Sequence, residues 1–208
     1  EMRSRFSGLN PIDFDMIAFS ISFEPDYLNA VSQLHYFGLP LERKFRDDSH
    51  PLILAGGSAI FINPEPLADF VDVFFIGEAE GLAEPFFKLF TDLPRKAFRN
   101  RLEASVSLPG IYVPQFYHSL HKGEKQTALE PEKGAPSRIQ RFWAEDESQL
   151  ITHSTLHEVN TAFKDMTLME ATRGCIWACR FCTAGFIYRP PRLPDLEKTY
   201  NSLAESLE

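Results

Sequence analysis

Three cysteines, Cys175, Cys179 and Cys182, follow one another with the spacing C-x3-C-x2-C. They are all the cysteines of the chain, so they do not form the dispersed, even-numbered set of a disulfide scaffold. Thiolates are the preferred ligands of iron–sulfur clusters. Three of them would bind three irons of a [4Fe–4S] cluster and leave the fourth iron open to chelate a substrate or cofactor. The spacing therefore predicts a metal centre with one open position.

Two other interpretations of these cysteines stay open. The same spacing describes one stripe of a helix, on which buried cysteines would be small core residues. A structural zinc site is the second alternative. It needs four ligands, and the fourth could come from His153 or His157.

The elements around the cysteines are predicted from their apolar patterns. Residues 166–171 are expected to form a strand, with the turn Thr172-Arg173-Gly174 at its exit. Residues 175–182 then form a loop, and a helix follows at 195–206 with Pro194 at its start. Four arginines could add positive charge near a thiolate-bound cluster and tune its potential, or could be ordinary solvated side chains: Arg173, Arg180, Arg189 and Arg192.

The N-terminal part alternates strand and helix patterns. Strands are predicted at 15–23, 51–55 and 73–76, and helices at 25–38, 64–70 and 80–90. Nearly continuous apolar strands that alternate with helices are typical of an α/β fold, with a parallel sheet covered on both faces. The stretch from 93 onward is expected to be a linker with a small β excursion. It contains a helix at 95–106, a strand at 110–114, a hairpin turn at 121–124 and an edge strand at 138–143.

Glycines follow two of the predicted strands, at Gly56-Gly57 and at Gly77-Glu78. Ligands of such sheets bind at the carboxyl ends of the strands, where glycine permits close approach. These four residues are therefore candidates for binding a phosphate or a corrin tail, or they serve turns alone. The chain contains no G-x-G-x-x-G motif for a dinucleotide and no D-x-H-x-x-G motif that would supply a histidine ligand to cobalt.

The composition excludes several classes of protein. With 21 basic and 29 acidic residues the formal net charge is −8, which argues against general binding to nucleic acids or membrane surfaces. No apolar run approaches the roughly 20 residues of a membrane-spanning helix, and no signal peptide is recognisable. Clustered thiols without an export signal predict a reducing, cytoplasmic location. The ends suggest an excised piece of a longer protein, with Leu207-Glu208 as a cloning remnant.

The cysteine loop resembles that of the radical SAM superfamily. The resemblance rests on Thr172-Arg173-Gly174-Cys175-x-x-x-Cys179-Arg180-Phe181-Cys182 and on residues 184–192. Where the usual pattern has glycine before the second cysteine, this chain has Ala178. Further strings at 15–23, 50–57, 63–67 and 75–80 resemble an uncharacterised branch with a cobalamin-binding-like domain ahead of the radical SAM barrel.

The resemblance implies cofactors and a reaction. The three cysteines would hold [4Fe–4S], and the open iron would chelate the methionine part of S-adenosylmethionine. Reductive cleavage would yield a 5′-deoxyadenosyl radical that abstracts hydrogen from an unknown substrate. Phe181 resembles the aromatic residue near the adenine, with core packing as the alternative role. Cobalamin is a further candidate cofactor, and an electron donor of flavodoxin or ferredoxin type a candidate partner.

The expected organisation has three parts. Residues 1–92 form a Rossmann-like, cobalamin-binding-like domain, residues 93–160 a linker or small subdomain, and residues 161–208 the start of a radical SAM barrel. Since a complete barrel takes about 250 residues, we expect this chain by itself to be inactive. A non-catalytic iron–sulfur or zinc module is the alternative function.

Overall fold

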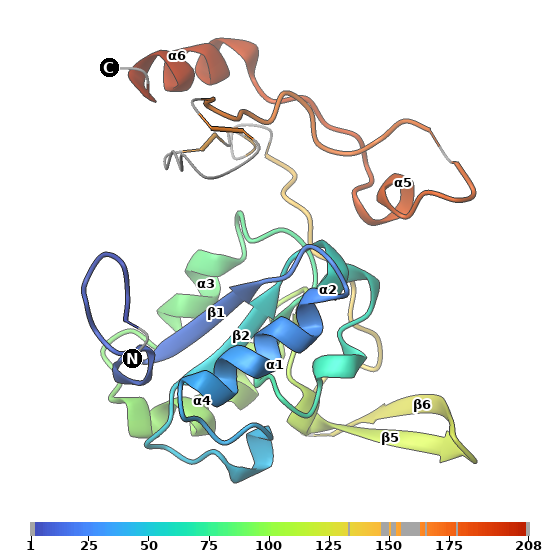
Figure 1. Ribbon diagram of the computed structural model, residues 1–208. Helices are drawn as coiled ribbons and strands as arrows, with labels where there is room; N and C mark the ends of the chain where they lie inside the picture. Colours follow the sequence, from blue (N-terminus) through green and yellow to red (C-terminus); the bar gives the residue numbers. More distant parts are fainter. Residues whose placement is uncertain are drawn as a thin grey trace. The chain divides into compact units, whose positions relative to one another are not determined.

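The computed structural model describes residues 3–132, 134–146, 150, 153–154, 163–164, 166–177 and 179–206. Contacts divide the chain into two units, unit 1 (Glu1–Phe142) and unit 2 (Trp143–Glu208). Figure 1 shows the helices and strands of each. Within the described residues, no helix is long and apolar enough to cross a membrane.

Unit 1 is built on a four-stranded sheet with the order β1-β2-β3-β4. Its strands are β1 (Met16–Ser20), β2 (Leu52–Gly56), β3 (Val73–Phe75) and β4 (Ile111–Tyr112). The first three are parallel, as their apolar runs predicted, and β4 is antiparallel to β3. The mixed sheet therefore corrects the expectation of a purely parallel one.

Helices connect the parallel strands and cover the sheet (Figure 1). They are α1 (Asp26–Tyr36), α2 (Ser58–Ile62), α3 (Ala83–Lys88) and α4 (Phe98–Ser105), with short 3₁₀ turns at Pro11–Asp13, Arg43–Phe45, Glu65–Leu67, Arg95–Ala97 and Pro114–Phe116. The helices predicted around 25–38, 80–90 and 95–106 are confirmed. Residues 64–70 contain only the turn Glu65–Leu67, and α2 was not anticipated.

Two apolar clusters show that both faces of the sheet are buried. Leu54 and Phe75 belong to the cluster that includes α3 and α4. Their neighbours Ile53 and Phe74 belong to the cluster that includes α1 and α2. Because successive side chains of a strand point to opposite faces, the two clusters lie on opposite sides of the sheet. The expectation of a sheet covered on both faces is confirmed.

The compact unit continues well past residue 92. Ile111 and Tyr112, placed in the expected linker, are buried and pair with Phe75 and Phe74 of β3. The rest of that stretch forms a hairpin of β5 (Tyr117–Lys122) and β6 (Lys125–Pro131), with its turn where the sequence predicted it. The expected edge strand at 138–143 is reduced to a single bridge between Gly77 and Phe142.

Buried charges close the amino end of the sheet. Asp72, just before β3, accepts hydrogen bonds from the Ile53 amide (2.8 Å) and from Arg99 Nη1 (2.9 Å). Arg46 Nη2 lies 3.4 Å from Asp72 Oδ2 and donates to the Phe70 carbonyl at 2.6 Å. Burial lowers the pKa of Arg46, and the charge of Asp72 opposes that shift. These contacts tie the starts of β2 and β3 to α4.

Unit 2 consists mostly of loops in its described part. It contains α5 (Ala184–Ile187) and α6 (Leu196–Ser206), the latter predicted from the sequence. Asp195 caps α6, because its carboxylate accepts hydrogen bonds from the amides of Glu197 (3.0 Å) and Lys198 (3.1 Å). The strand predicted at 166–171 is not formed. This stretch makes one bridge, from Met169 to His153.

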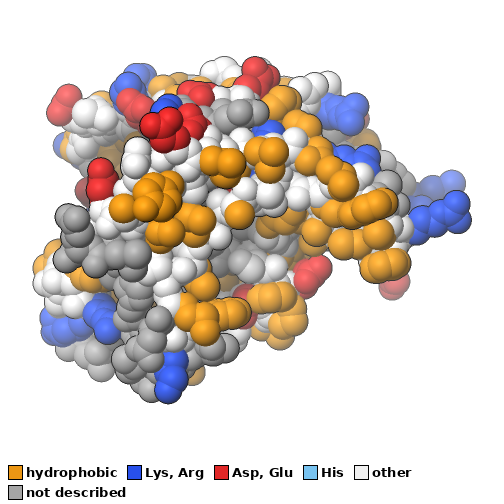
Figure 2. All heavy atoms as spheres, turned by 90° about the horizontal axis from the view of Figure 1, so that it is seen from above, with side chains coloured by type: hydrophobic (Ala, Val, Ile, Leu, Met, Phe, Trp, Pro, Cys, Tyr) orange, Lys and Arg blue, Asp and Glu red, His pale blue; other side chains and the backbone are white. Residues whose placement is uncertain are grey.

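The apolar side chains of residues 166–171 are exposed, and the described residues provide no neighbouring strand against which they could pack. An extended chain without a partner leaves its backbone groups unpaired and its apolar face in water. Figure 2 shows many apolar side chains on the molecular surface. Several large ones of unit 2 are exposed: Phe163, Met166, Leu168, Met169, Ile176, Trp177, Phe181, Phe186, Leu193, Leu196 and Tyr200.

Candidate metal centre

The three cysteines lie on an irregular loop of unit 2 between Gly174 and α5. All three are free thiols; Cys179 is exposed, and Cys175 and Cys182 are partly buried. The Cys182 amide donates to the Cys179 carbonyl at 3.1 Å, which closes a turn between these two residues. The loop is not a continuous helix, so the helical-stripe interpretation of the cysteines is not supported in the described part of this segment.

The donor set suits an iron–sulfur cluster, because the loop offers three accessible thiols that no disulfide consumes. The side chains are not yet gathered around one point. Among the described residues, no group of three or more histidine, cysteine, aspartate or glutamate side chains could hold a metal ion. The chemistry of the loop therefore fits the group, whereas convergence of the thiols would have to accompany binding.

A pair of backbone hydrogen bonds closes the base of the loop. The Arg173 amide donates to the Arg192 carbonyl at 3.0 Å, and the Arg192 amide donates back at 2.8 Å. Gly174 follows with a φ of +96°, and a Cβ at this position would lie 2.5 Å from the Tyr188 carbonyl oxygen. Glycine is therefore required where the chain leaves the bridge and enters the loop.

Two of the four arginines near the cysteines, Arg173 and Arg192, are buried and make structural hydrogen bonds. Arg173 is buried and its Nε and Nη2 donate to Glu170, at 2.9 and 2.5 Å. Arg192 donates from Nη1 to the Ala144 carbonyl at 2.8 Å. The exposed Arg180 and Arg189 remain as candidates for tuning a cluster; the Arg189 guanidinium lies 5.3 Å from the centre of the Phe186 ring. The role of Glu170 was not anticipated, although its opposite charge three residues before Arg173 was visible in the sequence.

Phe181 projects into solvent with 91% of its surface exposed. Its ring does not pack in the core of the described structure, so the core alternative for this residue is wrong there. An exposed ring beside Cys182 is free to stack on a ligand, and contact with adenine stays a prediction. Ile176 and Trp177, at 74% and 68% exposure, add apolar surface to the same loop.

Of the two histidines of the zinc alternative, the structure describes only His153. His153 is partly buried, and its Nε2 lies 2.9 Å from the Ser202 hydroxyl. Its Nδ1 is buried and has no hydrogen-bond partner. His157 lies outside the described residues. The described side chains of unit 2 therefore offer no assembled fourth ligand for zinc.

The candidate ligand residues of unit 1 lie at the carboxyl end of the sheet, where the strand pattern placed them. Gly56 ends β2, and Gly57, with a φ of +105°, precedes α2. A Cβ on Gly57 would meet the backbone of Ile21, 2.5 Å from its oxygen. Gly77 faces the backbone of Phe142, and Glu78 is buried. Close packing of the chain on itself thus accounts for Gly57 and Gly77 without a ligand.

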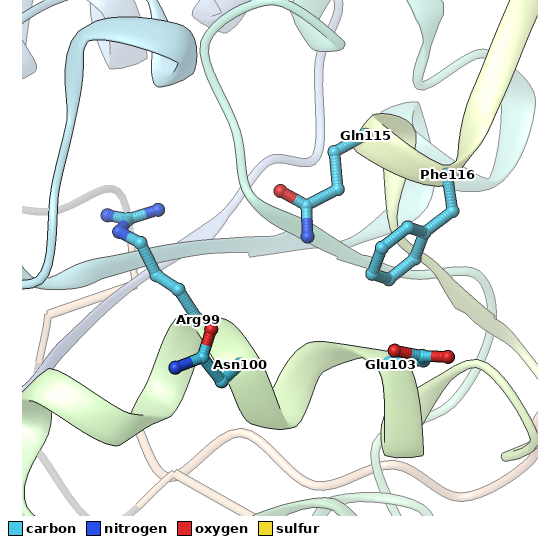
Figure 3. A pocket seen from close by; sticks show the side chains of 5 residues that line it. All are labelled: Arg99, Asn100, Glu103, Gln115 and Phe116. Atoms are coloured by element: carbon cyan, nitrogen blue, oxygen red, sulfur yellow. The ribbon is translucent and has the colours of Figure 1, made fainter. Parts of the chain in front are cut away.

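An open polar pocket lies elsewhere in unit 1, between α4 and the turn Pro114–Phe116. It has a volume of about 330 Å³ and is lined by Arg99, Asn100, Glu103, Gln115 and Phe116 (Figure 3). The sequence carried no motif for it. Arg99 donates from Nη1 to Asp72 and from Nε to the Asp47 carbonyl at 3.0 Å. Its guanidinium therefore belongs to the buried charges Arg46, Asp72 and Arg99 at the amino end of the sheet, which we call the amino-end network.

A comparison with protein families identifies the first unit. A family model described as "Radical SAM proteins, N-terminal" matches residues 7–114, which is more than half of the chain. The chain belongs to this radical SAM family. The matched region covers the sheet and its helices and ends before the cysteine loop.

A curated relative of this radical SAM protein extends the similarity. It is an uncharacterized protein of Methanocaldococcus jannaschii, 27% identical over 185 residues, which is 89% of this chain and 33% of the relative. The alignment covers 185 of the 208 residues of this chain. It therefore includes the cysteine loop, whichever end the unaligned residues lie at. The chain spans about a third of the length of this relative. No solved structure matches this chain.

Proposed function

We propose that the full-length protein is a radical SAM enzyme in which Cys175, Cys179 and Cys182 hold a [4Fe–4S] cluster. The observation that carries the proposal is the set of three free thiols at this spacing, in a chain whose first unit belongs to a radical SAM family. When bound, the cluster would supply the electron for cleavage of S-adenosylmethionine to a 5′-deoxyadenosyl radical, which abstracts hydrogen from the substrate.

The residues of the loop have separate tasks in this proposal. The bridge between Arg173 and Arg192 holds the two ends of the loop together, and Gly174 permits the turn into it. The three thiols between these anchors converge when the metal binds, because part of the binding free energy orders a site that is not preformed. Phe181 offers its exposed ring to the adenine. An electron donor of flavodoxin or ferredoxin type, acting in the cytoplasm, completes the proposal.

The test is anaerobic reconstitution of the full-length protein with iron and sulfide, followed by measurement of iron, sulfide and zinc content. We expect about four irons per chain, a broad visible absorbance and an electron paramagnetic resonance spectrum that changes when S-adenosylmethionine is added. In the Cys179→Ala variant, the iron and the absorbance should be lost.

The matched control is Arg180→Gln, which alters the exposed neighbour of Cys179 and leaves all three thiols in place. It should retain the iron content of the wild type. A cluster whose spectrum ignores S-adenosylmethionine would favour a non-catalytic iron–sulfur module. Colourless protein that holds zinc would favour the structural zinc site, and the absence of any metal would contradict both.

A further inference from the structure

Gly185, the second residue of α5, is buried against the cysteine loop. A Cβ at this position would lie 2.7 Å from the Trp177 carbonyl oxygen, which is closer than side chains approach backbone atoms. Trp177 lies midway between Cys175 and Cys179. The helix α5 begins just after Cys182. The helix that follows the third cysteine therefore contacts the segment between the first two.

The backbone conformation of Gly185 does not itself call for glycine. Its φ lies outside the left-handed region, in contrast to the φ of Gly174. Alanine is the better helix former, because glycine loses more conformational freedom on folding. Glycine is thus unfavourable for α5 at this position, and the contact with the Trp177 carbonyl is the reason for it that the structure gives.

A second contact shows that the cysteine loop lies along the chain that follows it. At the base of the loop, Gly174 lies against the Tyr188 carbonyl, and further along, Trp177 lies against Gly185. As the loop advances from residue 174 to 177, its neighbour in the later segment moves back from residue 188 to 185. The two segments therefore run in opposite directions, and residues 185–188 support the first part of the loop.

The Trp177 backbone is held by this contact, whereas its side chain is exposed, as is that of Ile176. Packing of these side chains in a core therefore does not position this part of the loop. The other cysteines have a contact of their own, since the Cys182 amide donates to the Cys179 carbonyl. The contact at Gly185 thus places the first part of the loop beside the helix that follows this turn.

We propose that Gly185 is a positioning residue of the cysteine loop. Because it has no Cβ, the Trp177 carbonyl can lie on α5, and this contact keeps Cys175 near enough to Cys179 and Cys182 for the three thiols to converge on one metal centre. Gly185 is not itself a ligand and acts through the Trp177 backbone. The inference rests on the proposed function for the identity of the metal, but convergence of the thiols is measurable without iron.

The first test is titration of the reduced, metal-free, full-length protein with arsenite, whose trivalent arsenic binds three converging thiols. The part of the binding that Cys179→Ala abolishes reports the cysteine loop. We expect about one arsenic per chain at this loop in the wild type. In Gly185→Ala the binding should be roughly tenfold weaker, the size of effect typical of residues that orient metal ligands.

The matched control is Ala184→Ser, which also adds one heavy atom to α5, at the exposed neighbour of Gly185. It should bind arsenite like the wild type, whereas the larger side chain of Gly185→Val should weaken binding further than Gly185→Ala. Equal affinity of the wild type and Gly185→Ala, or an equal loss in Ala184→Ser, would overturn the proposal. If the Gly185 variants do not fold, the wild type decides: failure of its loop to take up arsenic would overturn the proposal too.

Reconstitution with iron and sulfide separates this inference from the proposed function. In Gly185→Ala a chelator should remove the cluster roughly tenfold faster, and the electron paramagnetic resonance spectrum should differ from that of the wild type. Wild-type protein that binds arsenite but forms no [4Fe–4S] cluster would contradict the proposed function and leave the role of Gly185 intact. Clusters with the same spectrum and the same resistance to the chelator in both proteins would contradict the role of Gly185 alone.

Discussion

The two units bury their apolar side chains to very different extents. Unit 1 packs both faces of its sheet, with Phe74 and Phe86 completely buried. Among the described residues of unit 2, the buried apolar residues are Ala144, Leu150 and Pro194, whereas eleven large apolar side chains are exposed. The unit with a complete core is thus not the unit with the thiols. The difference teaches that unit 1 is ordered by its own packing, whereas the described part of the cysteine loop has no comparable core. In our proposal, metal binding would order that loop.

Truncation of a core side chain should show the largest contrast between the units. Phe86 contacts the rings of Phe75 and Phe90, with centroids 4.9 and 5.0 Å away. We expect Phe86→Ala to lower the free energy of unfolding by about 4 kcal/mol, because it removes a ring and leaves a cavity. Urea unfolding followed by circular dichroism measures this change.

Phe181→Ala is the control for that measurement, since it removes the same ring from an exposed position of unit 2. The expected change is less than about 0.5 kcal/mol. If both substitutions had similar effects, the distinction between a packed unit and an unpacked loop would be lost.

The buried charges of unit 1 should give the next largest effect. Asp72→Asn leaves Arg46 buried without its anionic partner and weakens the bond from Arg99. We expect a loss of about 3 kcal/mol in the free energy of unfolding, measured by urea denaturation. Glu84→Gln, which breaks the exposed pair with Lys88, is the control and should leave the free energy of unfolding nearly unchanged. An effect of Asp72→Asn as small as that of the control would contradict a structural role for the amino-end network.

The smallest effect concerns the exposed loop before β2. The Ser49 hydroxyl (2.6 Å) and amide (2.9 Å) donate to Asp47 Oδ1, and these bonds lower the pKa of Asp47 to about 2. The resulting stabilisation is present above the unfolded-state pKa of about 3.9 and is lost as the pH falls through about 2. Ser49→Ala should therefore raise the pKa of Asp47 and move this loss to higher pH.

A carboxyl-carbon NMR titration of Asp47 measures that shift directly. Ser32→Ala, on α1, is the control and should leave the pKa of Asp47 unchanged. An Asp47 pKa that stays near 2 in Ser49→Ala would mean that the hydroxyl does not contribute to the shift.

Local patterns predicted the elements whose apolar residues are contiguous or regularly spaced. The runs at β1, β2 and β3 are strands, and the segment after Pro194 is helix α6. The same reasoning failed at 166–171, where an apolar run has no neighbouring strand to pair with in the described structure. A strand needs a neighbouring strand as well as an apolar pattern. β3 has such neighbours in β2 and β4, whereas residues 166–171 have none among the described residues.

The sequence by itself determined the candidate ligand set, because three thiols at a fixed spacing are defined without any fold around them; the chemistry that they carry stays a prediction. It also predicted the three parallel strands of unit 1 and its helices α1, α3 and α4, through the positions of their apolar residues. Only the tertiary structure decided that β4 joins the sheet, that Arg173 pairs with Glu170 and that Phe142 packs against Gly77 and Gly110. These contacts join residues whose pairing depends on the path of the backbone in space, and no local propensity specifies that path.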